Sequence, residues 1–122
     1  MRLYGVRVFV DDLAAARDFY VDTLGLRLAW DGSAEHGAFG VDVDGAEIVV
    51  EEADEAARAE GLVGRFVGLS LSVDDVERRH LELAEKGVEF TEAPQAGDRG
   101  PLIAHFRDPS GNVLTLVGPM RF

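Results

Sequence analysis

The sequence of 122 residues contains no cysteine. Disulfide bonds, thiolate metal sites and a cysteine nucleophile are therefore excluded, and any catalysis must use histidine, carboxylate, hydroxyl or backbone groups. The sequence also lacks any apolar run close to the roughly 20 residues that cross a bilayer. Its first residues, MRLYGVRVFV, continue into an acidic segment without a cleavage-like site. We expect a cytoplasmic protein with no membrane partner.

Basic residues are scarce. The chain has 12 Lys and Arg and 23 Asp and Glu, which gives a formal net charge of -11. Proteins that bind nucleic acids gain affinity by neutralising phosphates with basic patches. We therefore expect no nucleic-acid partner. The acidity can attract a cationic ligand, although a solubilising surface explains it as well. The apolar fraction of 47% is that of a packed domain.

The chain contains an internal repeat. GVRVFVDDL at residues 5–13 aligns with GLSLSVDDV at residues 68–76, and residues 38–51 align with residues 104–117. A repeat of this kind predicts two copies of one supersecondary unit. We expect a single domain over residues 1–122, with module 1 at about 1–52, a polar and partly helical linker at about 53–65, and module 2 at about 66–122.

The first segment of each module has the period of a strand. Residues 5–10 place three valines on one face and Gly5, Arg7 and Phe9 on the other, and residues 68–73 repeat the alternation. An aspartate pair follows each segment and can cap a helix. The apolar stripes expected in these two helices are Leu13, Ala16, Tyr20 and Leu24 in the first, and Val76, Leu83 and Ala84 in the second.

Three short strands are expected after each helix. They lie at residues 26–31, 37–43 and 46–52 in module 1, and at residues 88–92, 101–107 and 112–118 in module 2. Residues 93–101 are rich in glycine and proline, which predicts a mobile loop that can act as a lid.

Two motifs are specific enough to indicate a family. FY-x-x-x-LG occupies residues 19–25, and DPSGN occupies residues 108–112. With the repeat, they resemble the vicinal oxygen chelate (glyoxalase/bleomycin-resistance/dioxygenase) superfamily over essentially the whole chain. The resemblance implies an α+β fold of two βαβββ modules, with eight mixed strands forming a half-barrel-like cavity and helices on the outer faces. It also implies a homodimer, and leaves open whether modules pair within one chain or across the dimer.

The resemblance implies where a metal would bind. The metal enzymes of the family use His or Gln at the start of the first strand, Glu in the fourth, His at the start of the fifth and Glu in the eighth. The corresponding residues here are Gly5, Val49, Gly68 and Thr115. Divalent cations need several nitrogen or carboxylate ligands at about 2.0 to 2.3 Å. We therefore expect neither a metal nor another cofactor, as in the drug-sequestering members of the family.

Side chains on the strand faces turned away from the helices are expected to line the cavity. Arg7 has two interpretations, an ion pair with Glu47 or Glu51 and an anchor for an anion. His105 precedes Phe106 where the family often has a polar cavity residue; it is the candidate if any residue is catalytic. The expected ligand-binding residues are Arg7, Phe9, Trp30, Phe39, Glu47, Glu51, Ser70, Ser72, His105 and Thr115.

Three functions are compatible with these features. The leading hypothesis is metal-independent binding of a small molecule, cationic or aromatic, by stacking and cation-π contact. The alternative is an enzyme of the superfamily, a lyase, isomerase or dioxygenase. Such an enzyme would use a displaced metal site, for which Glu47, Glu51 and His105 are the off-pattern candidates, or His105 as acid or base. The third is a scaffold whose cavity has closed and which associates with proteins.

Overall fold

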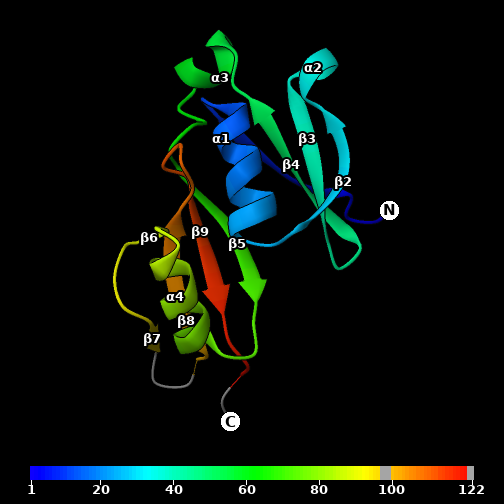
Figure 1. The fold of residues 1–122 in the computed structure, drawn as a ribbon. Coiled ribbons are helices and arrows are strands. Elements are labelled where there is room, and N and C mark those ends of the chain that lie inside the picture. Colours follow the sequence, from blue (N-terminus) through cyan, green and yellow to red (C-terminus); the bar gives the residue numbers. More distant parts are fainter. Residues whose placement is uncertain (97–99, 121–122) are drawn as a thin grey trace. The chain divides into compact units, whose positions relative to one another are not determined.

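The computed structural model describes residues 1–96 and 100–120 of the chain (Figure 1). The chain divides into two compact units, one formed by residues 1–65 with 109–112 and the other by residues 66–108 with 113–122. Each unit combines helices with one mixed β-sheet, so the expected α+β fold class is confirmed. Within the described residues, no helix is both long and apolar enough to span a membrane.

The first unit contains a four-stranded sheet in the order β1-β4-β3-β2. Strand β1 is parallel to β4, and the other pairs are antiparallel. The linker expected to be partly helical contains α3. The elements are β1 (Gly5–Val10), α1 (Leu13–Arg17), the π-helix η1 (Asp18–Thr23), β2 (Arg27–Gly32), α2 (Ser33–His36), β3 (Ala38–Val43), β4 (Ala46–Glu52) and α3 (Glu55–Ala59).

The second unit repeats this strand order as β5-β9-β8-β6, with β7 added to β8. The repeat seen in the sequence is therefore a repeat of sheet topology. The expected loop over residues 93–101 was wrong in part, because β7 pairs with β8 there; residues 97–99 of that loop lie outside the described residues. The elements are β5 (Phe66–Ser72), α4 (Val76–Glu85), β6 (Glu89–Phe90), β7 (Gln95–Ala96), β8 (Leu102–Arg107) and β9 (Val113–Val117).

Aspartates begin the helices as expected. The Asp12 carboxylate accepts a hydrogen bond of 3.0 Å from the backbone N–H of Ala15, and Asp75 accepts one of 3.0 Å from Arg78. Each bond satisfies a backbone donor that has no partner inside the helix. Asp54 caps α3 in the same way. The second aspartate of each pair is thus the capping residue.

The FY-x-x-x-LG motif forms a wider helical turn than the sequence predicted. The helix changes from α to π at Asp18, and the N–H of Leu24 bonds to the carbonyl of Phe19, five residues earlier, at 2.8 Å. The wider turn brings the neighbours Phe19 and Tyr20 into the core together, with their rings edge to face and their centroids 5.2 Å apart.

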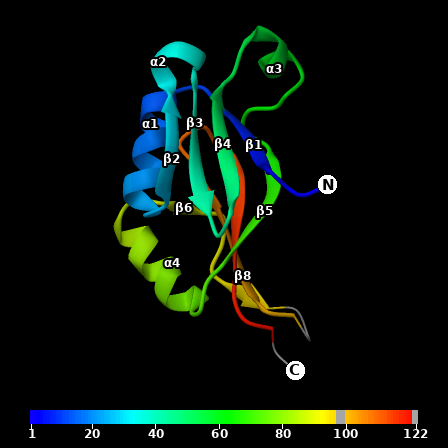
Figure 2. The same cartoon turned by 90° about the vertical axis from the view of Figure 1, so that its right-hand side faces the viewer.

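Helix α1 packs on one face of the sheet in the first unit, and α4 packs on one face of the sheet in the second (Figure 2). The expected stripe of the first helix is buried, whereas Ala84 of the second was wrongly expected in the core, since it is exposed. The core of the first unit includes Val8, Val10, Tyr20, Phe39, Val41, Ile48 and Val50. The core of the second unit includes Val76, Leu83, Ala104, Phe106, Leu114 and Leu116.

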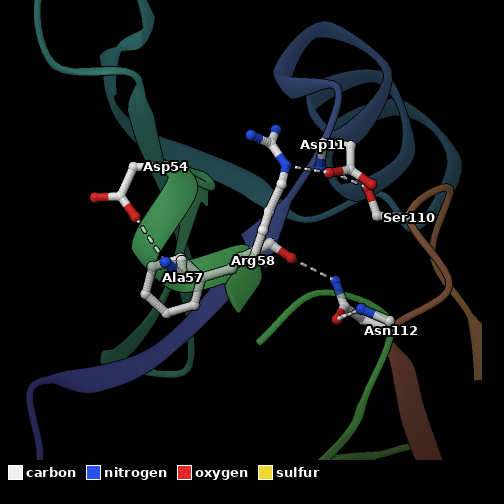
Figure 3. Close-up of polar contacts among 8 residues, drawn as sticks. Asp11, Asp54, Ala57, Arg58, Ser110 and Asn112 are labelled. Atoms are coloured by element: carbon white, nitrogen blue, oxygen red, sulfur yellow. Dashed lines mark hydrogen bonds and ion pairs between the residues drawn. The ribbon is translucent and has the colours of Figure 1, made fainter. Parts of the chain in front are cut away.

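Residues 109–112 of the DPSGN motif fold with the first unit. Asn112 is fully buried; its Oδ1 accepts a hydrogen bond of 2.9 Å from the N–H of Gly64, and its Nδ2 donates one of 2.8 Å to the carbonyl of Phe9 (Figure 3). The Ser110 hydroxyl accepts a bond of 2.9 Å from the N–H of Asp11. One buried amide thus joins the end of the linker to β1, which gives a physical reason for an asparagine at this position.

Candidate functional site

The face of the first sheet that carries no helix holds half of the residues expected to bind a ligand. Strand register sets this arrangement, because Arg7 pairs with Val49, Val49 with Gly40, and Gly40 with Trp30 across the sheet. We call this surface the helix-free face of the first sheet. It carries Arg7, Phe9, Trp30, Gly40, Glu47, Val49 and Glu51.

Phe39 does not belong to this face, and its assignment to the cavity was wrong. It pairs with Val50, whose side chain points into the helix-covered core, and its own side chain is 0% exposed. Neighbouring residues of a strand point to opposite faces, so the position of Gly40 on the helix-free face places Phe39 on the other.

Arg7 is held by Glu51. Both carboxylate oxygens accept hydrogen bonds, one from Nε and one from Nη2 at 3.0 Å, and the guanidinium carbon lies 5.4 Å from the ring centroid of Phe9. The hydrogen bond to Glu51 and its negative charge raise the pKa of Arg7 above its usual value. Of the two interpretations of Arg7, the structure shows the ion pair. Because the Arg7 side chain is 66% exposed, the pair adds little stability.

Trp30 is held by Glu47. The indole Nε1 donates a hydrogen bond of 2.6 Å to Oε1 of this half-buried carboxylate. A bond to an ionised acceptor is stronger than one between neutral groups. Among the residues that the structure describes, Oε2 of Glu47 has no hydrogen-bond partner. The site therefore presents an aromatic ring beside an available acceptor.

The second sheet also has a helix-free face, and the four residues expected in module 2 lie on it. Thr115 pairs with Ser70 on one side and with His105 on the other, and Ser72 follows on the same face. Nδ1 of His105 lies 2.8 Å from the Thr115 hydroxyl oxygen. The exposed Phe66 ring meets the imidazole edge to face, with centroids 5.5 Å apart.

The residues present do not fit the divalent metal of the family's enzymes. A Cβ atom at Gly5 would overlap the carbonyl oxygen of Glu47 and lie 2.9 Å from its carbonyl carbon, so a side chain fits there only if the backbone shifts. Gly68 has φ of +78°, a conformation that histidine rarely adopts. Val49 has no donor atom, and Thr115 offers one hydroxyl. Two of the replacements are therefore glycines that the backbone itself requires.

No other group of residues replaces the metal site within the described parts of the chain. There, no three or more His, Asp or Glu side chains are arranged to hold a metal ion. Of the off-pattern set, Glu47 and Glu51 belong to the first unit and His105 to the second. The first two carboxylates are instead occupied by Trp30 and Arg7.

A hollow of about 370 Å³ in the second unit is a poor alternative site. It lies beside the start of α4, and three charged side chains of its wall already pair with one another, Glu82 with Arg78 at 3.1 Å and with Arg79 at 3.3 Å. Small-molecule sites are mostly apolar, with a few directed polar groups. Ser72 is the one residue of the expected site that lines it. The helix-free faces of the two sheets are therefore better candidates for a ligand-binding site than this hollow.

The fold and the site define a class of protein, the paired βαβββ proteins with polar and aromatic side chains on the helix-free faces of their sheets. The chain belongs to the Glyoxalase/Bleomycin resistance protein/Dioxygenase superfamily, which it matches over residues 2–116. The uncharacterised protein YraH of Bacillus subtilis (strain 168) is 30% identical over 126 residues, which cover 95% of this chain and 97% of YraH.

Two solved structures are also similar. A member of the same superfamily from Sphaerobacter thermophilus DSM 20745 has a TM-score of 0.79 and 29% identity, with 98% of each chain covered. TnmS3, an antibiotic binding protein from Streptomyces sp. CB03234, has a TM-score of 0.81 and 31% identity, with 98% of this chain and 96% of TnmS3 covered.

Proposed function

We propose that this protein binds a small organic molecule without a metal ion, in the manner of a sequestering protein. The observation that carries the proposal is the chemistry of the four metal positions, two of which are glycines that the backbone requires. The helix-free faces nevertheless keep aromatic, acidic and hydroxyl side chains. The similarity to an antibiotic binding protein supports binding as the function. Sequestration needs shape and charge complementarity and no bond-making step.

The proposed ligand is cationic or aromatic. Trp30 and Phe9 offer ring faces for stacking, and Glu47 offers a carboxylate oxygen beside them. A cation over an aromatic ring and a donor on a carboxylate are both favourable contacts. Phe39, being in the core, makes no part of this surface.

His105 favours binding over acid or base catalysis. In a catalytic triad, a carboxylate orients the imidazole and stabilises its charged form. Here the partner of Nδ1 is the hydroxyl of Thr115, which orients the ring but carries no charge. The other nitrogen, Nε2, has no hydrogen-bond partner among the described residues, and we propose that it contacts the ligand.

Thermal denaturation tests the proposal. Purified protein should contain no stoichiometric metal by elemental analysis, and its Tm should not change with Mn, Fe, Zn or Ni. A compound that binds the native state should raise the Tm, and the stabilisation should grow with the logarithm of one plus the ratio of its concentration to Kd. We expect such a rise from cationic or aromatic compounds, reduced in a His105→Ala variant. A Tm increase with metal that is lost in His105→Ala or Glu47→Ala would instead support an enzyme with a displaced metal site.

A homodimer in the cytoplasm is part of the proposal. The exposed apolar side chains of Leu3, Tyr4 and Phe66, with the free edges of β1 and β5, are surfaces that a second copy can cover. Sedimentation equilibrium should give twice the chain mass of 13.2 kDa. A Phe66→Ser variant should weaken the dimer, and a monomer at micromolar concentration would contradict this part of the proposal.

A further inference from the structure

The indole of Trp30 lies in a recess formed by two glycines. A Cβ atom at Gly40 would overlap Nε1 of the indole, and would lie 2.6 Å from its Cε2 and 2.7 Å from Oε1 of Glu47. A Cβ atom at Gly32 would lie 3.2 Å from Cζ3, an atom of the six-membered ring. Because both rings of the indole lie against glycine backbone, the ring system lies along the sheet.

The recess leaves one side of the indole available. Both glycines are buried, whereas Trp30 itself is only half-buried. The side of the ring that faces the sheet covers the glycines, so the exposed part of Trp30 is directed away from the sheet. The 2.6 Å hydrogen bond from Nε1 to Glu47 fixes the rotation of the ring in this plane.

We propose that Gly40 and Glu47 are positioning residues that hold Trp30 as a fixed stacking platform for a planar ring that carries a hydrogen-bond donor. The platform binds the face of the ring, and Oε2 of Glu47 accepts from the donor at its edge. A platform that is fixed before binding loses less conformational entropy when the ligand arrives. This inference rests on the proposed binding function and narrows its ligand to planar amines or aromatic cations.

Trp30 is the only tryptophan of the chain, so its fluorescence reports its position directly. The probes are proflavine as a planar cation, 2-naphthalenesulfonate as a planar anion and 1-adamantanamine as a cation that is not planar. The variants are Gly40→Ala and Glu47→Gln. Gly100→Ala is the matched control, because a Cβ there meets no atom within 4 Å.

The wild-type protein should bind proflavine more tightly than either other probe. In Gly40→Ala the displaced indole should show red-shifted emission and stronger quenching by acrylamide, and proflavine affinity should fall by about tenfold or more. Glu47→Gln keeps an acceptor for Nε1, so the emission should be retained while proflavine affinity falls by about tenfold. Gly100→Ala should change neither quantity.

Unchanged emission and unchanged proflavine affinity in Gly40→Ala would overturn the inference, as would equal binding of proflavine and 1-adamantanamine. If Gly40→Ala does not fold, Trp30→Leu provides the test, because it must lose proflavine binding for the inference to hold. If other compounds stabilise the wild-type protein and none of these probes binds, the stacking role of Trp30 is contradicted, whereas the proposed binding of a small molecule is supported. If no compound binds at all, the stacking role of Trp30 and the proposed binding function are both contradicted.

Discussion

Replacement of Asn112 by alanine should lower the free energy of unfolding by about 3 kcal/mol, because it removes three hydrogen bonds that this fully buried amide makes to the backbone. The amide of Asn112 accepts from Gly64 and Arg65 and donates to Phe9, at 2.9, 3.4 and 2.8 Å. The side chain of Asn112 is 0% exposed, whereas the backbone groups that it bonds are only part-buried.

Urea denaturation followed by far-UV circular dichroism measures this effect. Ser110→Ala is the matched control, since it removes the bond to the Asp11 N–H at a more exposed position and should cost under about 1 kcal/mol. If the two variants unfolded at the same urea concentration, the role assigned to the buried amide would be wrong.

The second large effect is expected at Gly5. Gly5→Ala and Gly5→His should each destabilise the protein by about 2 kcal/mol, because their shared Cβ overlaps the backbone of Glu47 and the strands must separate to admit it. Gly5→His restores the type of residue that the family's metal enzymes carry there, yet it should acquire no metal.

The measurements are Tm and metal content after incubation with Zn or Ni. Gly100→Ala, where a Cβ meets open space, should change stability by no more than about 0.5 kcal/mol. A Gly5→His variant that kept the wild-type Tm and bound one metal ion per chain would show that the backbone does not exclude a ligand at residue 5.

Much of the fold could be predicted because its signals are local. The alternation in residues 5–10 and 68–73 and the helix caps at Asp12 and Asp75 depend on neighbours in the sequence, and they are confirmed. The π-turn depends instead on packing two adjacent aromatic rings into one core, which no local pattern specifies.

The site was predicted less completely because side-chain partners depend on register. Glu47 and Glu51 lie on the same face of β4, so the sequence could not choose between them as the partner of Arg7. Phe39 was misplaced for the same reason. The pairing of β3 with β4 places Phe39 opposite Val50 on the helix-covered face and Gly40 opposite Val49 on the helix-free face.

The role of Gly40 had only a weak signal, a glycine inside a buried strand. Such a glycine often marks a close approach of another group to the backbone. Here that group is the indole of Trp30, which comes from a different strand and could not be identified without the pairing of β2 with β3.

Calorimetric titration of metal-stripped protein tests metal-independent binding most directly. The ligand for the titration is the compound that gives the largest Tm increase. Protein treated with EDTA should bind it with a stoichiometry of one molecule per site, and added Mn, Zn or Ni should leave the Kd of that compound unchanged. Binding that appeared only after metal was added would contradict the account and would make the metal part of the site.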